Sequence, residues 1–418
     1  MTEFSVRLAD RQATCKQRNR MVLGTAFTAL LILSCTTVSL AQDTQNNPNE
    51  ILFGMSTALT GPAADLGLNM KTGVDLAFDE ANRNGDIPGM KLRLVALDDG
   101  YEPSRTAPNM RTLIDKHQVL AVIGNVGTPT AVVAVPIANA SRTLFFGAFT
   151  GAGVLRKTPP DRYVINYRAS YREETAAMVD ALIRDVGLEP EEIGFFTQRD
   201  AYGDAGYVGG ITALKRHGLS DESLVAHGRY VRNTDAVENA LADILGADTP
   251  VRAVIMVGAY EPSARFIQLA REYELDALFI NVSFVGAAPL AKALGDDVDG
   301  VVVTQVVPGV GSKAPIVEDF HEALHKADAD AESSFGALEG YIAGRIIIKA
   351  LRDLEEPPTR ETIVDALENM GDFDIGVGEV LHFDSTDHQA CHKVWPTVMR
   401  GGRIEDLQWS TLRGAKGR

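Results

Sequence analysis

Short runs of apolar residues rich in Val, Ile and Phe alternate along the chain with longer segments in which apolar residues recur at helical spacing. This alternation is typical of βα units built around parallel sheets. In the first part of the chain it predicts strands at 51–56, 92–97, 119–123, 143–146 and 163–166, with helices near 66–83, 104–116 and 129–141. The expected fold class is therefore α/β.

The same pattern returns in a second set of segments. It predicts strands at 193–197, 224–230, 253–257 and 278–281, with helices near 203–217, 235–245 and 262–272. Beyond residue 300 we expect a strand at 301–307, helices near 315–326, 335–354 and 359–370, and hairpin strands within 378–409. Because the two sets repeat one architecture, and 418 residues are ample for two cores, we expect two doubly wound parallel-sheet lobes.

The first 41 residues have the pattern of a secretory signal peptide. Basic residues precede an apolar run at 21–33, and small residues up to Ala41 follow it. The run is shorter than the about 20 apolar residues that a membrane-spanning helix needs. An alternative is a lipoprotein processing site in which Cys35 becomes the acylated first residue. We expect a disordered lead-in at 42–50, which has no apolar residue, and a short tail at 410–418.

Charge and cysteine content narrow the function classes. The formal net charge is -16, and removal of the basic first segment makes the chain more acidic, which argues against nucleic acid as a partner. Two of the three cysteines lie in the first 41 residues, so that Cys391 alone remains after cleavage. The mature chain is then expected to form no internal disulfide, although its compartment would tolerate one.

Several short blocks, taken in order, carry a resemblance to a known family. They are TGPAADLG at 60–67, LDD at 97–99 with EP at 102–103, VIG at 122–124, DAYG at 200–203, and FD at 383–384 with His388. In this order and spacing the chain resembles the type I periplasmic solute-binding proteins of ABC importers, in particular the branch for branched-chain amino acids and amides. The resemblance covers about residues 51–409.

The resemblance implies two lobes joined by three crossovers near 166–169, 300–304 and 376–380. The first lobe would comprise 51–168 plus 301–377, and the second 169–300 plus 378–409. It also implies a monomer outside the cytoplasmic membrane that captures a small polar solute, such as an amino acid, amide or carboxylate, by lobe closure. Membrane permease subunits of an ABC importer would be its partners. The alternative is a sensor that hands the same closure to a membrane kinase or chemoreceptor.

Loops at the carboxyl ends of parallel strands are the expected ligand site, because helix N-termini open there. One such loop ends at Thr128, which can cap a helix that has Pro129 at its first position, and the family places a ligand-contacting hydroxyl there. A second, small-residue loop follows a strand, and the resemblance implies ligand contacts at Phe149 and Thr150. At Thr128, helix capping and ligand contact can coexist.

The second lobe is expected to supply tyrosines. Tyr202 and Tyr260 each follow a strand and match family tyrosines that touch ligand, although either could be an ordinary lobe-surface residue. Two positions depart from the family pattern. Ser283 stands where amino-acid binders have an acidic partner for the α-ammonium, and Leu66 replaces an aromatic that stacks on ligand in some members. A desolvated ammonium without an anionic partner is costly, so an α-amino acid ligand is put in doubt.

Arg168 lies at the first expected crossover and has two open roles. It can recognise a carboxylate in the cleft, or it can brace the hinge through carboxylates of the protein.

Other chemistry finds little support in the sequence. The chain has no nucleophile elbow, phosphate-binding loop or zinc-protease motif, so we expect no enzyme and no cofactor. The cluster of His382, His388, Cys391 and His392 fits no zinc spacing, because in an extended segment Cys391 would oppose the histidines. Asp98 and Asp99 point to opposite faces of a strand and are expected to end it rather than to form an acid-base pair.

Overall fold

The computed structural model describes residues 49–414. The predicted signal peptide and the alternative acylation site at Cys35 lie outside the described residues. No helix within 49–414 has the length and apolar content needed to cross a membrane.

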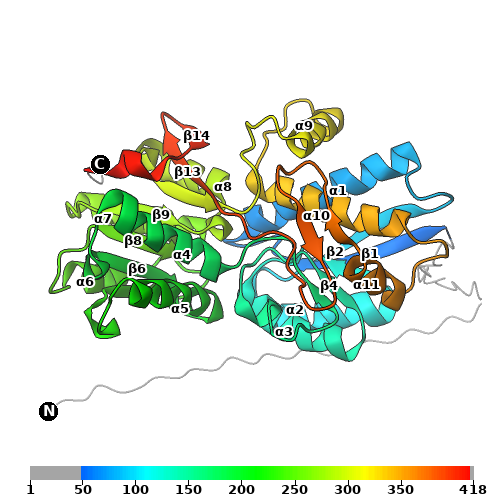
Figure 1. Ribbon diagram of the computed structural model, residues 1–418, viewed down its shortest axis with the longest axis horizontal. Coiled ribbons are helices and arrows are strands. Elements are labelled where there is room, and N and C mark those ends of the chain that lie inside the picture. The colour runs from blue at the N-terminus through cyan, green and yellow to red at the C-terminus, as the bar shows by residue number, and fades with distance from the viewer. Residues whose placement is uncertain (1–48, 415–418) are drawn as a thin grey trace, which may run out of the picture. The chain divides into compact units, whose positions relative to one another are not determined.

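The first lobe is built on a parallel sheet in the order β2-β1-β3-β4-β5 (Figure 1). Its strands are β1 (Glu50–Thr57), β2 (Lys91–Asp98), β3 (Ala121–Ile123), β4 (Leu144–Phe146) and β5 (Val164–Ile165). A small antiparallel pair, β11 (Gly371–Phe373) and β12 (Leu381–Phe383), packs beside it through Phe383, whose ring centroid is 6.4 Å from that of Phe146. Since Glu50 pairs with Lys91, the expected lead-in stops one residue earlier than predicted.

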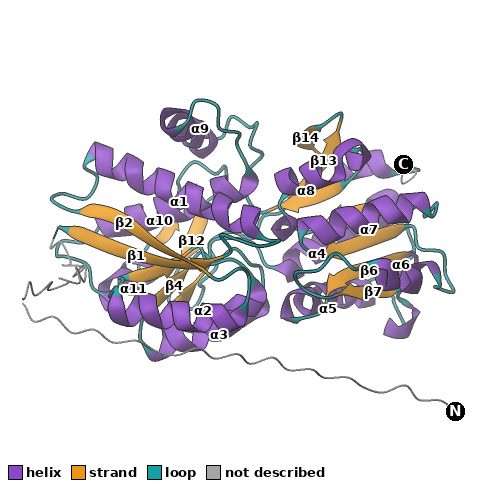
Figure 2. Cartoon of the chain, turned by 180° about the vertical axis from the view of Figure 1, so that it is seen from behind, coloured by secondary structure: helices purple, strands orange, loops and turns teal. Residues whose placement is uncertain are grey.

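Helices cover both faces of this sheet (Figure 2). They are α1 (Ala64–Asn84), α2 (Pro103–Arg111), α3 (Thr128–Ala140), α9 (Pro315–Ala327), α10 (Phe335–Arg352) and α11 (Arg360–Glu368). Successive strand residues point to opposite faces, so Leu52 packs with the core beneath α2 and α3, whereas Phe53 packs with the core beneath α1. Both faces are buried, as the continuous apolar strands predict.

Helices α1 and α10 approach each other unusually closely. A Cβ atom on Gly73 of α1 would lie 1.9 Å from the carbonyl oxygen of Ala337, and one on Gly340 of α10 would lie 2.2 Å from that of Met70. Only glycine therefore fits at these crossing points. This contact holds the first turns of α10 against the core and thereby positions its Glu339, discussed below.

The second lobe has a mixed sheet in the order β14-β13-β10-β9-β8-β6-β7. Its parallel strands are β6 (Ile193–Gln198), β7 (His227–Tyr230), β8 (Ala253–Val257), β9 (Leu278–Asn281) and β10 (Val302–Gln305). The edge pair β13 (Trp395–Arg400) and β14 (Arg403–Asp406) runs antiparallel, which confirms the predicted hairpin material. The expected tail begins later than predicted, because Leu412 is buried in the short helix η8 (Trp409–Leu412).

Within the described residues five α-helices belong to this lobe, and Figure 1 shows them around its sheet. They are α4 (Tyr171–Ala181), α5 (Ala201–Arg216), α6 (Glu238–Leu245), α7 (Tyr260–Glu272) and α8 (Ala287–Leu294). The sequence pattern predicted α5, α6 and α7 but missed α4 and α8. A signal for α4 was present, because Ser170 and Glu173 form a capping box at its start. The predicted α/β class with two doubly wound lobes is confirmed.

Two of the three expected crossovers lie later in the chain than predicted. The first agrees, because β5 ends at Ile165 and α4 begins at Tyr171. The second follows residue 305, since β10 pairs with β9 in the second sheet. The third follows residue 383, since β12 still pairs with β11 beside the first lobe. Residues 302–305 and 378–383 therefore lie in the lobes opposite to those expected, because strand pairing rather than the local pattern decides sheet membership.

Candidate ligand-binding site

The loops that follow the strands of the two lobes meet one another. Parallel strands deliver their carboxyl ends to one edge of a sheet, where ligands of open α/β sheets bind. In the first lobe Tyr101 follows β2, and in the second lobe Gln198 ends β6. The amide of Gln198 donates a hydrogen bond of 3.1 Å to the Tyr101 hydroxyl, which joins the two edges directly.

Five buried aromatic side chains gather where these edges meet. We call them the ring cluster; they are Tyr101 and Phe149 of the first lobe and Tyr171, Tyr202 and Phe284 of the second. The Phe284 ring is central, with centroids 4.6 Å from Tyr202, 5.5 Å from Phe149 and 5.9 Å from Tyr101. The Tyr171 and Tyr202 rings lie 5.2 Å apart. The cluster is thus shared by both lobes.

Tyr101 holds its place through a special backbone turn. Its φ is 63°, in the left-handed region, and the Asp99 carboxylate accepts a hydrogen bond from its amide at 2.9 Å. Gly127, with φ of 100°, lies beneath the ring, and a Cβ there would be 2.1 Å from Cε2 of Tyr101. A side chain at residue 127 is therefore excluded. Burial raises the pKa of Tyr101 well above its ordinary value, so its hydroxyl stays neutral.

The two predicted threonines face each other beside these rings. Oγ1 of Thr128 and Oγ1 of Thr150 are 2.7 Å apart, and both residues are buried. The prediction that Thr128 caps α3 is wrong, because Gly127 is the cap residue and Thr128 is the first helical residue. This shift of one position leaves the Thr128 hydroxyl free of the helix end and directs it toward Thr150.

Leu66 and Tyr260 occupy a different edge of the interface between the lobes. The Leu66 side chain lies against Gly286 of the second lobe, and both Leu66 and Tyr260 are buried. Burial and the neighbouring Asp65 raise the pKa of Tyr260 to about 12, while the Asp65 backbone hydrogen bonds to it. Tyr260 thus reaches the first lobe but shares no ring contact with the cluster in the described structure.

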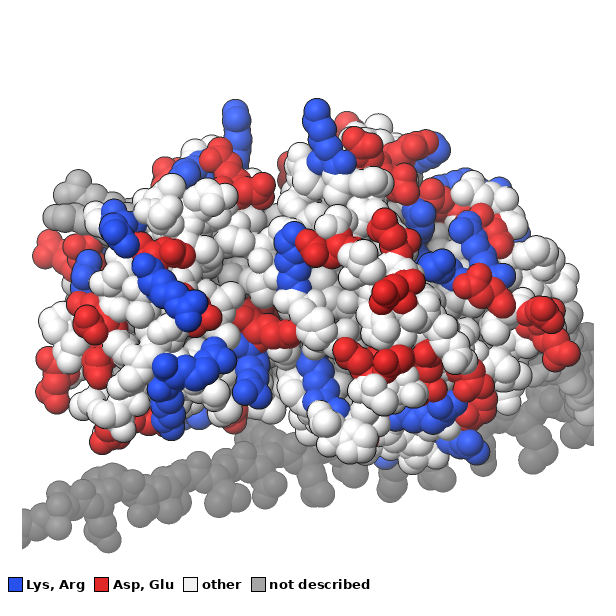
Figure 3. Space-filling model, viewed as in Figure 1, with Lys and Arg blue, Asp and Glu red and all other residues white. Residues whose placement is uncertain are grey.

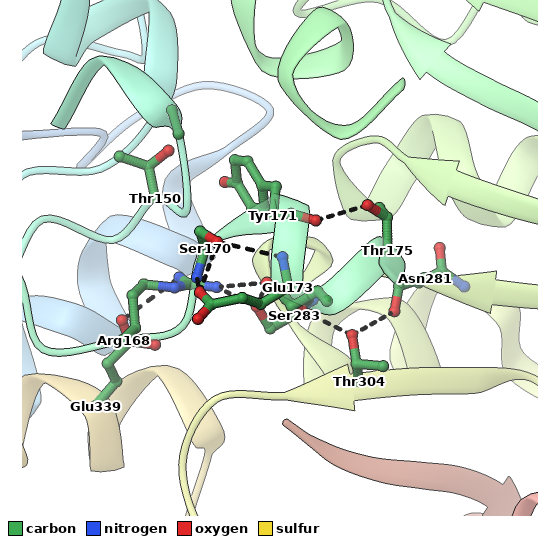
Figure 4. Close-up of polar contacts among 12 residues, drawn as sticks. Thr150, Arg168, Ser170, Tyr171, Glu173, Thr175, Asn281, Ser283, Thr304 and Glu339 are labelled. Atoms are coloured by element: carbon green, nitrogen blue, oxygen red, sulfur yellow. Dashed lines mark hydrogen bonds and ion pairs between the residues drawn. The ribbon is translucent and has the colours of Figure 1, made fainter. Parts of the chain in front are cut away.

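Ser283 contacts a group of buried charges that borders the ring cluster, and Figure 4 shows it beside Arg168. We call Arg168, Glu174 and Glu339 the charge cluster. The Arg168 guanidinium is 3.4 Å from Glu174 of α4 and 3.4 Å from Glu339 of α10, so it bridges the two lobes from the first crossover. It also donates a hydrogen bond to the Ser283 hydroxyl.

Glu174 is held by several donors. It accepts hydrogen bonds from the amide of Ser283 at 2.8 Å, from the Ser283 hydroxyl at 2.9 Å and from the Thr304 hydroxyl at 2.7 Å. Sequence reasoning missed both Glu174 and Glu339, because no local pattern distinguishes them from solvated helix carboxylates. Ser283 was noticed for lacking a charge, and the structure places a carboxylate from another helix on its hydroxyl.

Glu339 has no comparable set of partners. Its side chain is only 4% exposed, and burial raises the pKa of its carboxyl to about 7, with Glu174 adding to this and Arg168 opposing it. The Arg168 and Arg156 guanidiniums oppose this shift, but removal of the carboxyl from water disfavours its ionised form more strongly. The Glu339 carboxyl therefore titrates near neutral pH.

A second, more exposed contact joins the lobes near Tyr101. We call it the polar bridge. Arg232 of the second lobe pairs with Glu102 at 2.9 Å and with Asp200 at 3.1 Å, and the amide of Asn233 donates to Glu102 at 2.6 Å. Asp200 also caps α5 by accepting from the amide of Tyr202 at 3.0 Å. The bridge thus connects the first lobe to the helix that carries a ring of the cluster.

Two surface pockets open where the lobes meet. One, of about 610 Å³, is lined by Gly151 and Val154 of the first lobe and by Tyr171 and Ala205 of the second. The other, of about 340 Å³, lies between Pro62 of the first lobe and Thr234 and Ala259 of the second. The first pocket reaches the ring cluster itself, since Tyr171 is part of its wall.

The histidine and cysteine cluster near the C-terminus does not assemble a metal site in the described residues. His382 pairs with Asp372 at 2.7 Å, and His392 pairs with Glu173 at 2.6 Å. His388 is buried, and its Nδ1 donates a hydrogen bond of 2.9 Å to the Val164 carbonyl. Cys391 is buried. These groups serve as separate structural contacts at the third crossover.

Charged side chains on the surface are mixed rather than gathered. On the face shown in Figure 3, acidic and basic residues alternate over both lobes. The net charge of -16 therefore does not form a field of one sign on that face.

Comparison with known proteins gives a family for this fold. Residues 50–403 match the family model described as periplasmic binding protein. Leu/Ile/Val-binding protein homolog 7 of Brucella abortus is 26% identical over 321 residues, which are 73% of this chain and 78% of that protein. Leu/Ile/Val-binding protein BraC3 of Rhizobium johnstonii is 25% identical over 86% of this chain and 93% of its own.

Solved structures agree with this match. A possible leucine/isoleucine/valine-binding protein from Rhodopirellula baltica SH 1 is 52% identical, with a TM-score of 0.85 over 87% of this chain and 98% of that one. A substrate-binding periplasmic protein from Ralstonia solanacearum is 30% identical, with a TM-score of 0.78 over 85% of this chain and 100% of that one. The family is extracytoplasmic, and the chain belongs to the periplasmic binding protein family with the type I fold.

Proposed function

We propose that this chain captures a small solute between its lobes outside the cytoplasmic membrane and delivers it to the permease of an ABC importer. The observation that carries the proposal is the ring cluster, in which Phe149 of the first lobe contacts Phe284 of the second, which in turn contacts Tyr202. Binding sites of this kind combine aromatic walls with a few polar groups. The threonine pair and the charge cluster supply those polar groups.

Lobe closure follows from the shared character of the site. A solute that touches both lobes gains its full set of contacts only when they close, so it favours the closed state. Three segments of the described chain connect the lobes. A few residues in such segments are enough to form a hinge. The relatives named as Leu/Ile/Val-binding proteins support a solute of amino-acid size.

Calorimetric titration of the purified, host-processed protein tests capture. The panel would contain aliphatic and aromatic amino acids, their amides and the corresponding carboxylates. We expect one class to bind with micromolar affinity, which corresponds to about -8 kcal/mol. Tyr202→Ala should weaken that binding about tenfold or more, because it removes a ring from the cluster.

Tyr207 offers a matched control on the same helix. Its ring stacks on His227, with centroids 4.0 Å apart, and makes no contact with the ring cluster. Tyr207→Ala should therefore leave ligand affinity within about twofold of wild type. Equal losses in both variants, with both still folded by circular dichroism, would remove the ring cluster from the site.

Delivery to an importer needs a cellular test. Uptake of the solute identified by titration is measured in a host strain with this gene deleted and then restored as wild type or Tyr202→Ala. We expect uptake to return with the wild type and to stay low with the variant. Unchanged uptake after deletion would argue against the transport role while leaving capture intact.

A further inference from the structure

Arg168 places a buried cation at the border of the ring cluster. Its guanidinium carbon lies 5.0 Å from the Phe149 ring centroid and 5.9 Å from that of Tyr171. The same guanidinium donates to Ser283, the residue that precedes Phe284. Its neighbours on this side are therefore residues of the proposed site, and its charge faces the place where solute is held.

Part of this cation's hydrogen-bonding capacity is unused. Nη2 donates to Ser283 and Glu174, but Nε and Nη1 are buried and donate no hydrogen bond within residues 49–414. The Glu339 carboxylate pairs with Nη1 only at 3.4 Å, outside good hydrogen-bond geometry. A buried N–H without an acceptor is costly, and a carboxylate is the acceptor that best matches a guanidinium.

The carboxylates around the rings, in contrast, are engaged by protein donors. Asp99 accepts from Ser56, Thr106 and the amide of Tyr101, and Asp200 accepts from Arg232, Gln198 and the amide of Tyr202. Glu174 has its three donors from Ser283 and Thr304. Among the described residues, each of these carboxylates already has protein partners, and Glu339 pairs with Arg168. A ligand ammonium brought to this place would have to compete with them.

We propose that the captured solute is a carboxylate with an apolar body and no ammonium group, and that Arg168 receives its anionic end; this inference rests on the proposed capture function. The rings of the cluster contact the apolar body. Arg168 supplies the cation of the site. An ammonium group on the ligand would therefore lack a free carboxylate partner and would be costly to bury.

Glu339 gives this inference a pH signature. The charged groups that face it are Arg168 of the first crossover, Glu174 of α4 and Arg156 of the loop after β4, and its pKa is raised to about 7. An anion beside Arg168 is repelled by ionised Glu339 and tolerated by its protonated form. Carboxylate affinity should therefore weaken as pH rises above 7, by up to about tenfold per pH unit. An ammonium-bearing ligand would show the opposite trend.

Matched ligand pairs provide the test. Titration compares 4-methylpentanoate with leucine and 3-phenylpropanoate with phenylalanine, each at pH 6, 7 and 8. We expect the acids to bind at least about tenfold more tightly than the amino acids, because an unpaired buried ammonium is costly. Equal or tighter binding of the amino acids would overturn the inference and leave capture standing. If no member of either pair binds and no amide does, capture itself fails, and the inference fails with it.

Two nearly isosteric variants separate recognition from folding. Glu339→Gln keeps the shape of the cluster and removes the titrating group, so carboxylate affinity should become independent of pH between 6 and 8. Asp65→Asn alters a half-exposed carboxylate beside Tyr260 and should leave carboxylate affinity unchanged. A pH dependence that persists in Glu339→Gln, or a loss of carboxylate affinity in Asp65→Asn, would contradict the assignment to Arg168.

Discussion

The charge cluster and the polar bridge each hold one cation and two carboxylates but have different surroundings. Each joins the lobes through one arginine between two carboxylates. In the polar bridge the side chains of Arg232 and Glu102 are 22% and 38% exposed, whereas in the charge cluster those of Arg168 and Glu174 are 1% and 0% exposed. Water and salt screen the first group, while the second depends on its protein partners alone. One arginine between two carboxylates therefore joins the lobes only weakly in the polar bridge, whereas in the charge cluster each charge requires its partners.

Arg168→Met should produce the largest effect. It leaves Glu174 and Glu339 buried without a cation, and breaking a buried pair typically costs about 3–5 kcal/mol. The free energy of unfolding from urea denaturation at pH 8 measures this loss. Arg168→Lys, which keeps the charge, should recover part of it. A loss below about 1 kcal/mol at pH 8 would mean that burial makes no difference between the two groups.

Glu339→Gln should change how stability depends on pH. A carboxyl whose pKa rises from its ordinary value to about 7 on folding binds more protons in the native state, so the wild type loses stability as pH rises from about 4.5 to 7. This loss should amount to about 3 kcal/mol, from the size of the shift. The variant should lack this component in unfolding experiments across the same pH range. Parallel stability profiles would show that Glu339 does not titrate there.

Thr304→Val should have an intermediate effect. It removes the 2.7 Å hydrogen bond to Glu174 while preserving side-chain volume, and a buried hydrogen bond to a charged group contributes about 2 kcal/mol. Urea denaturation again measures the change. Thr234→Val is a fitting control, because the Thr234 hydroxyl is exposed and donates only to the Val231 carbonyl. A comparable loss of unfolding free energy in Thr234→Val would show that burial of the Thr304 hydroxyl does not strengthen its contribution.

Arg232→Met should have the smallest effect. The pairs of Arg232 are partly open to solvent, and pairs at the surface contribute up to about 1 kcal/mol and are screened by salt. The difference from wild type in the free energy of unfolding should shrink as sodium chloride is raised to about 1 M, where the screening length is about 3 Å. A large loss of unfolding free energy that does not depend on salt would mean that the polar bridge stabilises the protein as strongly as the charge cluster does.

Much of the fold could be predicted because local patterns of apolar residues determine its strands and helices. Apolar runs mark the strands of both lobes. The strand-end rule selected loops, and the family resemblance then singled out Thr128, Phe149, Thr150 and Tyr202 within them. The missed helix α4 had a local signal in its capping box at Ser170. The shifted crossovers had no local signal, because the sequence of a strand such as β10 does not indicate which of the two sheets it joins.

The sequence by itself determined the α/β class and the two repeated lobes, since periodicity is a property of neighbouring residues. That the strand-end loops hold the ligand stays a prediction. Only the tertiary structure decided which distant residues meet. Phe284 reaches Phe149, and Arg168 lies between Glu174 and Glu339, through the packing of both lobes. Burial, which separates the charge cluster from the polar bridge, arises from the whole fold, so no segment of the chain records it.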